Sequence, residues 1–332
     1  MKIAAVVPTR NRKKLLRECL QALLSQTRPL DEIIVIDGNS SDGTDLMVKD
    51  EFPHVTYIRL EKDIGASASF HEGMKLAYIK GHDWIWLMDD DAEPKVDALE
   101  NLIKWSCLED AVALAPVVVN EFMEIQEYHR GNISLDDVFP LFQKPLPKES
   151  YRLNMPVEIT FTSLVGPLIS RKAIAKAGLP RKDFFIYHDD VEYSMRLAKV
   201  GRMYLIPKAY IIHKTGRKRK NLVEKRLLGR KVHLVPYDEL WKGYYSVRNI
   251  VYLRRLHSAN KFKSIVKELI LQCRRMARAI LFEDYKLKVL HFYASAFVDG
   301  LRGVFDNEKP KRILYGKMKY SRMLGKSRDA HH

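Results

Sequence analysis

The sequence predicts an α/β protein with a mostly parallel sheet flanked by helices, followed by a basic, mainly helical C-terminal region. Short apolar runs typical of strands alternate with segments of helical spacing up to the DDD triplet at residues 89–91. Such alternation produces right-handed βαβ units and a parallel sheet covered on both faces. Residues 201–332 hold 32 Lys and Arg against 10 Asp and Glu, whereas residues 1–200 carry a net charge of −6. We therefore expect a domain over residues 1–215 that binds cations and a region over residues 216–332 that meets an anionic partner.

The strands and helices of the first half follow from these patterns in order. Apolar runs predict strands over residues 2–7, 31–37, 55–60 and 83–89. Helical spacing predicts helices over residues 12–26, 44–52 and 69–81, the second with Thr44 as its N-cap. Farther along we expect a strand over 166–170, a helix over 171–178, a helix over 190–201 and a last strand over 209–213. Residues 120–160, which contain four prolines, are read as an irregular insertion or an acceptor-side loop.

Polar segments follow the carboxyl ends of the first four predicted strands, at residues 8–11, 37–44, 61–69 and 89–94. In open α/β sheets, ligands bind beyond these strand ends. The sequence has neither a GxGxxG fingerprint nor a GxxxxGK[ST] loop, so a nucleotide site here must manage phosphates with carboxylates and a metal ion. Asp37 and Asp63 are candidates to accept hydrogen bonds from a base or ribose, although Asp37 is equally suited to forming a turn.

The triplet Asp89-Asp90-Asp91 directly follows the apolar run WIWLM. Adjacent carboxylates repel one another and resist burial, which costs stability unless a positive charge lies among them. A solvated acidic turn is the alternative interpretation.

These motifs together resemble a known family. PTRN, IVIDGNSSDGT, the DDD triplet, HDDVEYSMRLAKVG and the later His213 occur in this order over residues 3–213. They resemble the family-2 glycosyltransferases, which have the Rossmann-like GT-A fold. DIGASASFHEGMKLA, HDDVEY and KGYYSVRN further resemble the branch that contains galactofuranosyl- and rhamnosyltransferases. That branch has more glycines where this chain has Gly65 to Ser69.

The resemblance implies a role for each site residue. The residues implied to bind the donor nucleotide are Pro8, Thr9, Arg10, Asn11, Asp37, Asp63, Gly65, Asp89 and Asp90. Asp89, Asp91 and His213 are implied to hold a metal ion, and carboxylates with an imidazole suit Mn²⁺ or Mg²⁺, the imidazole favouring Mn²⁺. Asp190 is implied to be the catalytic base, with Asp189 orienting the acceptor or sugar. Helix capping remains the alternative role for this acidic pair.

The expected reaction is inverting, metal-dependent transfer of galactofuranose or rhamnose from a UDP- or dTDP-sugar. The base takes the proton of an acceptor hydroxyl, and the metal neutralises the departing diphosphate. The acceptor is expected to be a lipid-linked or cell-surface glycan, because many relatives use polyprenyl-diphosphate-linked acceptors. Tyr244, Tyr245 and Arg248 are candidates to contact it.

The basic C-terminal region offers two candidate surfaces. GRKRKN at residues 216–221 has the composition of a loop that closes over a diphosphate. Residues 261–281 carry a helical apolar stripe at Phe262, Ile265, Leu269, Cys273, Met276 and Ile280. This stripe fits ordinary helical packing, and it fits an amphipathic helix lying on an anionic membrane equally well. No apolar run is long enough to span a bilayer and the three cysteines fit no disulfide framework, so we expect a cytoplasmic protein, peripheral on the cell membrane.

Three other functions fit part of the sequence. A sugar nucleotidyltransferase needs a glycine-rich basic loop, and PTRNRKK contains no glycine. A nucleic-acid-binding protein fits the pI of about 9.6, but the acidic first 200 residues show no such signature, so no nucleic acid partner is expected. A protein that binds anionic membranes without catalysis remains a third interpretation. The oligomeric state is not predicted.

Overall fold

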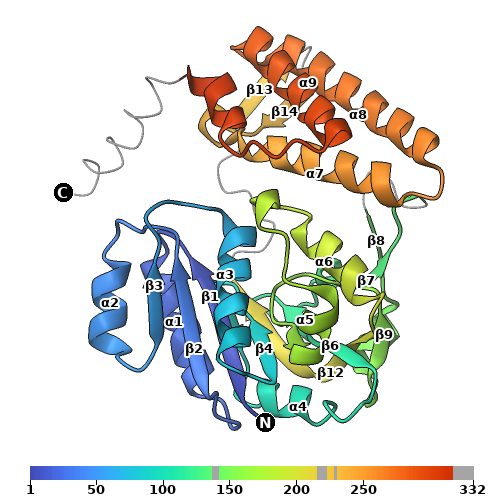
Figure 1. Cartoon of the computed structure of the whole chain (residues 1–332). Helices are drawn as coiled ribbons and strands as arrows, with labels where there is room; N and C mark the ends of the chain where they lie inside the picture. The colour runs from blue at the N-terminus through green and yellow to red at the C-terminus, as the bar shows by residue number, and fades with distance from the viewer. Residues whose placement is uncertain (137–141, 215–222, 228–229, 317–332) are drawn as a thin grey trace. The chain divides into compact units, whose positions relative to one another are not determined.

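The chain forms two compact units in this computed structural model, which describes residues 1–136, 142–214, 223–227 and 230–316 (Figure 1). The first unit comprises Met1–Ser134, Leu141–Phe185 and Asp189–Gly216. The second comprises Leu135–Pro140, Ile186–His188 and Arg217–His332. The chain therefore leaves the first unit after Phe185 and returns to it at Asp189. The basic segment 216–221 lies outside the described residues.

The parallel block predicted from the first four strands is confirmed. β1 (Ile3–Thr9), β2 (Glu32–Asp37), β3 (Thr56–Arg59) and β4 (Trp84–Leu87) lie in the order β3-β2-β1-β4, with every pair parallel. The connecting helices are α1 (Lys13–Leu24), α2 (Thr44–Glu51) and α3 (Ala66–Ile79). Parallel strands joined in this way present their carboxyl ends at one edge. That edge is therefore where the polar segments gather.

The sheet continues with strands of both directions. β11 (Leu168–Ser170) lies antiparallel between β4 and β6 (Ala111–Val119). β6 is parallel to β12 (Arg202–His213), which begins seven residues earlier than predicted. β5 (Ala92–Pro94) is antiparallel to β12 with Ala92 opposite His213. This register fixes the end of β12 beside the residues that precede β5.

Helices cover both faces of the first-unit sheet (Figure 1). On one face Val7 packs with Leu16 and Leu20 of α1 and with residues of α2 and of α4 (Ala98–Ile103). On the other face Val6 packs with Phe70 of α3 and with residues of α5 (Arg171–Ala177) and α6 (Asp189–Leu197). Because successive strand residues point to opposite faces, an uninterrupted apolar strand supplies both cores.

Three local predictions are corrected. Residues 120–160 are not irregular throughout, since they contain short elements too brief for a periodic signal: η1 (Glu127–His129), β7 (Arg130–Ile133), β8 (Gln143–Pro145), η2 (Lys148–Arg152) and β9 (Val157–Ile159). β7 and β8 form a small sheet with β10 (Phe161–Thr162). Thr44 is not the N-cap of α2, because Gly43 takes that place with φ +78°, and the Thr44 amide and hydroxyl both donate to Asp42. The helix predicted over 190–201 ends earlier, at Leu197.

The second unit is mainly helical. α7 (Lys242–His257), α8 (Lys261–Phe282) and α9 (Lys286–Arg302) pack on one another (Figure 1). The hairpin of β13 (Val223–Leu227) and β14 (Arg230–Leu234) and the turn η4 (Tyr237–Glu239) precede them. Among the described residues, no helix combines the length and hydropathy that a bilayer crossing needs.

The prediction that Tyr244, Tyr245 and Arg248 contact an acceptor is wrong. All three side chains are buried within the second unit. The Tyr244 hydroxyl donates to Asp299 at 2.6 Å, and the Tyr245 hydroxyl donates to the Asn307 carbonyl at 2.6 Å. These residues anchor α7 within the core of the second unit.

Gly73 permits the close approach of α3 to β1. A Cβ at this position would overlap Cγ1 of Val6, a stiff β-branched side chain in the buried strand. We expect Gly73→Ala to lower the free energy of unfolding by about 1–3 kcal/mol through overpacking. The matched control is Gly243→Ala in α7, where a Cβ meets nothing within 4 Å, so there we expect no loss and up to about 1 kcal/mol of gain. Urea unfolding measures both, and equal effects would contradict this account of the packing.

Candidate functional site

The predicted acidic and histidine residues meet at the carboxyl edge of the first-unit sheet. β1 ends at Thr9, β2 at Asp37 and β4 just before the triplet. The pairing of Ala92 with His213 brings the end of β12 to the same place. The structure thus joins residues more than a hundred positions apart in the sequence.

Asp89, Asp91 and His213 form a cluster in which the ligand atoms all lie within 4.8 Å of one another. Nε2 of His213 lies 3.2 Å from Oδ1 of Asp91 and 4.0 Å from Oδ2 of Asp89. On its other side, Nδ1 of His213 lies 3.4 Å from Oε1 of Gln126. With an acceptor at Nδ1, the ring can keep its Nδ1 proton while Nε2 faces the carboxylates, where it donates to Asp91 when the ring is protonated and offers its lone pair to a cation when it is not. Two carboxylates and an imidazole nitrogen in this arrangement fit a divalent cation such as Mn²⁺.

Arg12 is the counter-ion of the triplet, and the sequence analysis did not single it out. Its Nη1 donates to Oδ1 of Asp90 at 3.0 Å and to Oδ2 of Asp91 at 2.9 Å, with 45% of the side chain exposed. The Thr9 hydroxyl donates to Asp90 at 2.8 Å. The signal for Arg12 was the basic run RNRKK, which follows the first strand directly. Gln126 had no comparable signal, because it lies in the part predicted to be irregular.

Burial and mutual repulsion raise the pKa values of Asp89 and Asp90. The pKa of Asp89 rises to about 7, first through burial and then through the charge of Asp91. The pKa of Asp90 rises to about 6 through burial, which the positive charge of Arg12 partly offsets. Burial alone would lower the pKa of His213, but the hydrogen bond and charge of Asp91 outweigh it and raise that pKa. The site therefore favours an added positive charge.

The residues predicted to line the nucleoside side occupy the loops around this edge. Nη1 of Arg10 donates to Asp63 at 2.6 Å, and the Gly65 amide donates to the same carboxylate at 2.9 Å. Asn11, with φ +52°, accepts at Oδ1 from the Ser41 amide at 2.7 Å. Arg10, Asn11, Asp63 and Gly65 thus tie the loops after β1, β2 and β3 to one another.

Asp37 serves a turn in this structure. It is fully buried and accepts from the amide and hydroxyl of Ser40, at 2.9 and 2.6 Å. The Tyr57 hydroxyl donates to its other oxygen. With three protein donors already bonded, the carboxylate favours the turn-forming interpretation over a direct contact with a nucleoside.

The second acidic pair begins α6. Asp189 is buried, and burial raises its pKa. Oδ1 of Asp190 accepts from the Val191 amide at 2.8 Å, as a residue at a helix N-terminus can. Burial, followed by the charge of Asp189, raises the pKa of Asp190 to about 8, and the charge of Asp89 adds to the shift. The Asp189–Asp190 pair and the Asp89–Asp91 triplet therefore act on each other electrostatically.

Glu192 and Arg196 brace this helix. They form two hydrogen bonds of 2.8 Å, between Nε and Oε1 and between Nη2 and Oε2. Nη2 of Arg196 also donates to the Leu179 carbonyl at 3.0 Å, just beyond α5. This i, i+4 pair anchors α6 to its neighbour.

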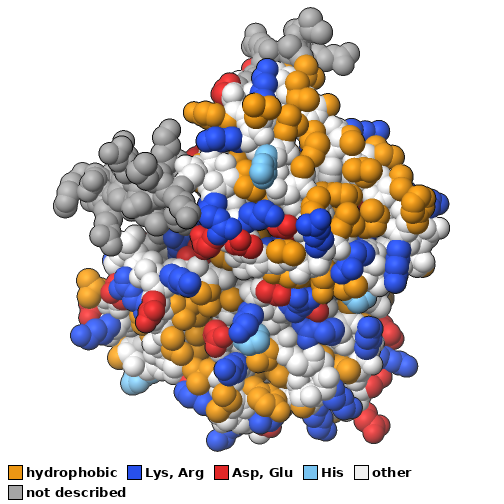
Figure 2. All heavy atoms as spheres, turned by 45° about the horizontal axis from the view of Figure 1, so that its top comes forward, with side chains coloured by type: hydrophobic (Ala, Val, Ile, Leu, Met, Phe, Trp, Pro, Cys, Tyr) orange, Lys and Arg blue, Asp and Glu red, His pale blue; other side chains and the backbone are white. Residues whose placement is uncertain are grey.

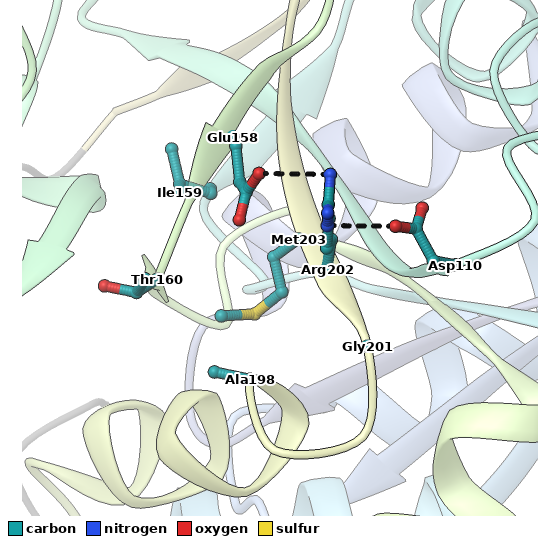
Figure 3. Close-up of a pocket in the computed structure, with 8 residues that line it drawn as sticks. All are labelled: Asp110, Glu158, Ile159, Thr160, Ala198, Gly201, Arg202 and Met203. Atoms are coloured by element: carbon teal, nitrogen blue, oxygen red, sulfur yellow. Dashed lines mark ion pairs between the residues drawn. The ribbon is translucent and has the colours of Figure 1, made fainter.

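A surface pocket of about 430 Å³ lies at the opposite edge of the sheet, where β12 begins (Figure 3). Arg202 crosses it and pairs with Asp110 at 3.0 Å and with Glu158 at 3.7 Å. The ion pairs occupy its polar groups, and it lies at the amino end of β12 whereas His213 lies at the carboxyl end. It is therefore separate from the candidate site.

Residues 4–178 match glycosyl transferase family 2. Galactofuranosyltransferase GlfT1 of Mycolicibacterium smegmatis is 27% identical over 266 residues, covering 76% of this chain and 82% of that protein. The dTDP-rhamnosyl transferase RfbF of Shigella flexneri is 22% identical over 289 residues, covering 86% and 91%. Among solved structures, GalNAc-T7 with UDP, GalNAc and Mn²⁺ aligns with a TM-score of 0.58 and 15% identity, covering 92% of this chain and 56% of that one. S. aureus TarS 1–349 aligns with a TM-score of 0.53 and 12% identity, covering 95% and 87%. These structural neighbours are GT-A glycosyltransferases, so the predicted fold class is confirmed.

The raised pKa values predict how stability depends on pH. In the unfolded chain the carboxyls of Asp89, Asp90 and Asp190 titrate near 3.8, but in the folded protein they titrate at about 7, 6 and 8. Between these values the folded state binds more protons than the unfolded state, so stability falls as pH rises. We expect the melting temperature in EDTA to fall from pH 5.5 to pH 8.5, and to fall less in Asp190→Asn.

The matched control is Asp136→Asn in the second unit. Hydrogen bonds from Ala259 and Ser264 outweigh burial and lower the pKa of Asp136, so its removal should not flatten this profile. Parallel profiles for the wild-type protein and Asp190→Asn would contradict the raised pKa of Asp190.

Proposed function

The chain belongs to glycosyl transferase family 2 and is a glycosyltransferase, and on this premise we propose that it is an inverting, metal-dependent enzyme. It transfers galactofuranose or rhamnose from a UDP- or dTDP-sugar to a hydroxyl of a lipid-linked or cell-surface glycan. The names of GlfT1 and RfbF support these sugars. The observation that carries the proposal is the convergence of Asp89, Asp91 and His213 at the strand ends. Because the chain belongs to a glycosyltransferase family, the sugar nucleotidyltransferase and the non-catalytic binding protein are no longer favoured as functions.

In this proposal the first unit binds the donor. Asp89, Asp91 and His213 would hold a divalent cation, which when bound supplies charge neutralisation for the departing diphosphate. Arg12 offers a second positive charge, because its guanidinium already lies between Asp90 and Asp91 and is partly exposed. Asp90 faces the ribose or sugar. The loops of Arg10, Asn11, Asp63 and Gly65 shape the nucleoside side.

Asp190 acts as the base. Its carboxylate takes the proton of the acceptor hydroxyl as that oxygen forms a bond to C1 of the sugar. The bond from C1 to the diphosphate oxygen breaks on the opposite side, so the configuration inverts. Once ionised, a carboxylate with a pKa near 8 is a stronger base than an ordinary carboxylate, which supports this role. Asp189 orients the acceptor or the sugar beside it.

The second unit is proposed to lie on an anionic membrane at its cytoplasmic face. α8 buries mainly polar residues, whereas an ordinary packed helix buries its apolar ones. The buried residues of α8 are Ser264, Glu268, Gln272 and Ala279. In the predicted apolar stripe, Phe262 is 82% exposed, Leu269 47% and Ile280 49%, whereas Ile265 packs on the core. Simple helical packing is therefore wrong for most of the stripe.

Buried polar groups hold α8 in this orientation. Glu268 pairs with Arg254 of α7 at 3.1 Å, with both side chains almost fully buried. Ser264 donates to Asp136 at 2.8 Å. The polar face of α8 therefore points into the interior of the second unit, and its apolar face points to the surface.

The exposed face has the composition of an interfacial helix. From residue 262 to 281 it extends roughly 30 Å at 1.5 Å per residue. On the helical wheel, the basic residues Lys263 and Arg274 border the apolar sector, and both are exposed. Figure 2 shows hydrophobic patches beside Lys and Arg side chains on the face it presents. An anionic lipid surface satisfies both groups, and a polyprenyl-linked acceptor would be found there.

The division of roles in the first unit can be tested with two substitutions. We expect Asp91→Asn to weaken Mn²⁺-dependent nucleotide binding at least tenfold, because a ligand of the cation is lost. Asp190→Asn should leave that binding nearly intact and lower transfer by about 10²–10⁴-fold. Calorimetry with UDP, dTDP and GDP, each with Mn²⁺ or EDTA, measures binding. Transfer is followed as nucleotide release from UDP-galactofuranose or dTDP-rhamnose with a synthetic polyprenyl-diphosphate-linked disaccharide.

Asp110→Asn at the opposite edge is the control and should change neither quantity. Equal loss of nucleotide affinity in Asp91→Asn and Asp190→Asn would refute the division of roles. Wild-type binding in EDTA would refute the metal dependence.

Membrane binding predicts a different result for the second unit. We expect Phe262→Glu with Leu269→Glu to reduce sedimentation with phosphatidylglycerol vesicles at least tenfold, since each apolar side chain contributes about 1.5–3 kcal/mol on burial. Leu46→Glu in α2, where the leucine is 62% exposed but lies in the first unit, is the control and should bind as the wild type does. Undiminished binding of the double variant, or equal binding to neutral phosphatidylcholine vesicles, would show that this face is not the lipid contact.

A further inference from the structure

The residues immediately before Asp189 have an unusual backbone. Phe185, Tyr187 and His188 have φ values of +67°, +68° and +62°, in the left-handed region that side chains with a Cβ rarely adopt. Three such residues among four positions do not hold this shape through local preference. Surrounding contacts must therefore maintain it, and those contacts decide how the chain enters α6.

Asn249 of α7 supplies the most direct contact. Its Nδ2 donates to the Tyr187 carbonyl at 2.8 Å and to the Ile186 carbonyl at 3.2 Å. Its Oδ1 accepts from Nε of Arg248 at 2.9 Å, which fixes the orientation of the amide. The side chain is fully buried. Both hydrogens of the side-chain amide are thus bonded to the turn before Asp189.

The same helix also contacts the end of the turn. Oγ of Ser246, three residues before Asn249, lies 3.4 Å from Nε2 of His188. Burial, with the charges of Arg254 and Arg275, lowers the pKa of His188 to about 4. The ring is therefore neutral at physiological pH and able to accept from the serine hydroxyl. These contacts all lie within the second unit, to which Ile186–His188 belongs.

Phe185 is held separately, within the first unit. Its carbonyl accepts from the Ser67 amide at 3.2 Å. Gly65 packs so closely against Phe185 that a Cβ would lie 2.5 Å from this carbonyl oxygen. The turn is thus fixed at its start by the loop before α3 and along its length by α7.

We propose that Asn249 is a positioning residue for the transfer reaction: by holding the carbonyls of Ile186 and Tyr187 it fixes the backbone that delivers Asp189 and Asp190. This inference rests on the proposed role of Asp190 as the base. It also gives a function to the KGYYSVRN segment, in which Tyr244, Tyr245 and Arg248 are buried. Asn249 acts through the chain and touches no substrate.

The inference is tested with Asn249→Asp, which keeps the shape of the side chain but loses both donors. We expect kcat to fall about 10–100-fold, since small displacements of reacting groups have effects of this size. Mn²⁺-dependent nucleotide affinity should stay within about twofold of the wild type. Amide exchange of the peptide spanning residues 185–190 should be faster by at least tenfold. A side chain that merely supported the fold would accelerate exchange throughout α7, without this split between kcat and affinity.

Two further variants complete the test. Asn249→Ser keeps a single short donor, folds more readily, and should give intermediate values of kcat and exchange. Tyr315→Phe removes a hydrogen bond of the same unit, from the Tyr315 hydroxyl to the Tyr237 carbonyl, that does not touch the turn, and should match the wild type in both.

The outcomes separate this inference from the proposed function. Wild-type kcat and wild-type exchange at residues 185–190 in Asn249→Asp or Asn249→Ser, with Asp190→Asn inactive, would overturn the role of Asn249 alone. Full activity of Asp190→Asn would overturn the base assignment, and faster exchange in Asn249→Asp would still show that Asn249 holds the turn.

Discussion

Repulsion among carboxylates at the carboxyl edge of one sheet is the constraint around which the first unit is organised. Asp89, Asp90 and Asp91 follow a buried strand, and Asp190 lies within reach of the charge of Asp89. Burial disfavours their ionised forms, so the edge is unfavourable until positive charge is added. The protein supplies part of that charge itself, through Arg12 and His213. In the proposed function a cation supplies the remainder, and the edge then exchanges stability of the free protein for affinity.

The β5–β12 pairing converts this constraint into a site. β5 begins one residue after the triplet, and its register places Ala92 opposite His213. A one-residue slip would turn His213 to the other face of the strand. The grouping of Asp89, Asp91 and His213 therefore depends on main-chain hydrogen bonds. Gln126 then orients the imidazole from the loop between β6 and η1. Positioning these side chains so closely requires a rigid sheet edge, and the buried apolar strands behind the edge make it rigid.

The sequence was informative where one local pattern determines the structure. Apolar runs and helical spacing identified the parallel block, and the ordered motifs identified Asp89, Asp91 and His213 as neighbours. Arg12 and Gln126 were missed, because the choice of a counter-ion or second acceptor depends on which loops approach in three dimensions. The stripe of α8 was recognised, but periodicity does not reveal which face of a helix points inward. The Arg254–Glu268 pair and the Ser264–Asp136 bond decide that orientation, and their members are up to 128 residues apart.

The path of the chain explains why the acidic pair was harder to interpret than the triplet. The triplet follows a strand whose neighbours are all in the first unit, so its position is set by the sheet. Asp189 instead follows three residues that belong to the second unit, and the turn preceding it has left-handed φ values that its own side chains disfavour. In our proposal its placement depends on Asn249 of α7 as well as on the contacts of α6 within the first unit. If Asp190 is the base, as we propose, the acidic cluster at the sheet edge and the placement of Asp190 have separate structural supports, so a change in the basic helical region can alter transfer while nucleotide binding is preserved.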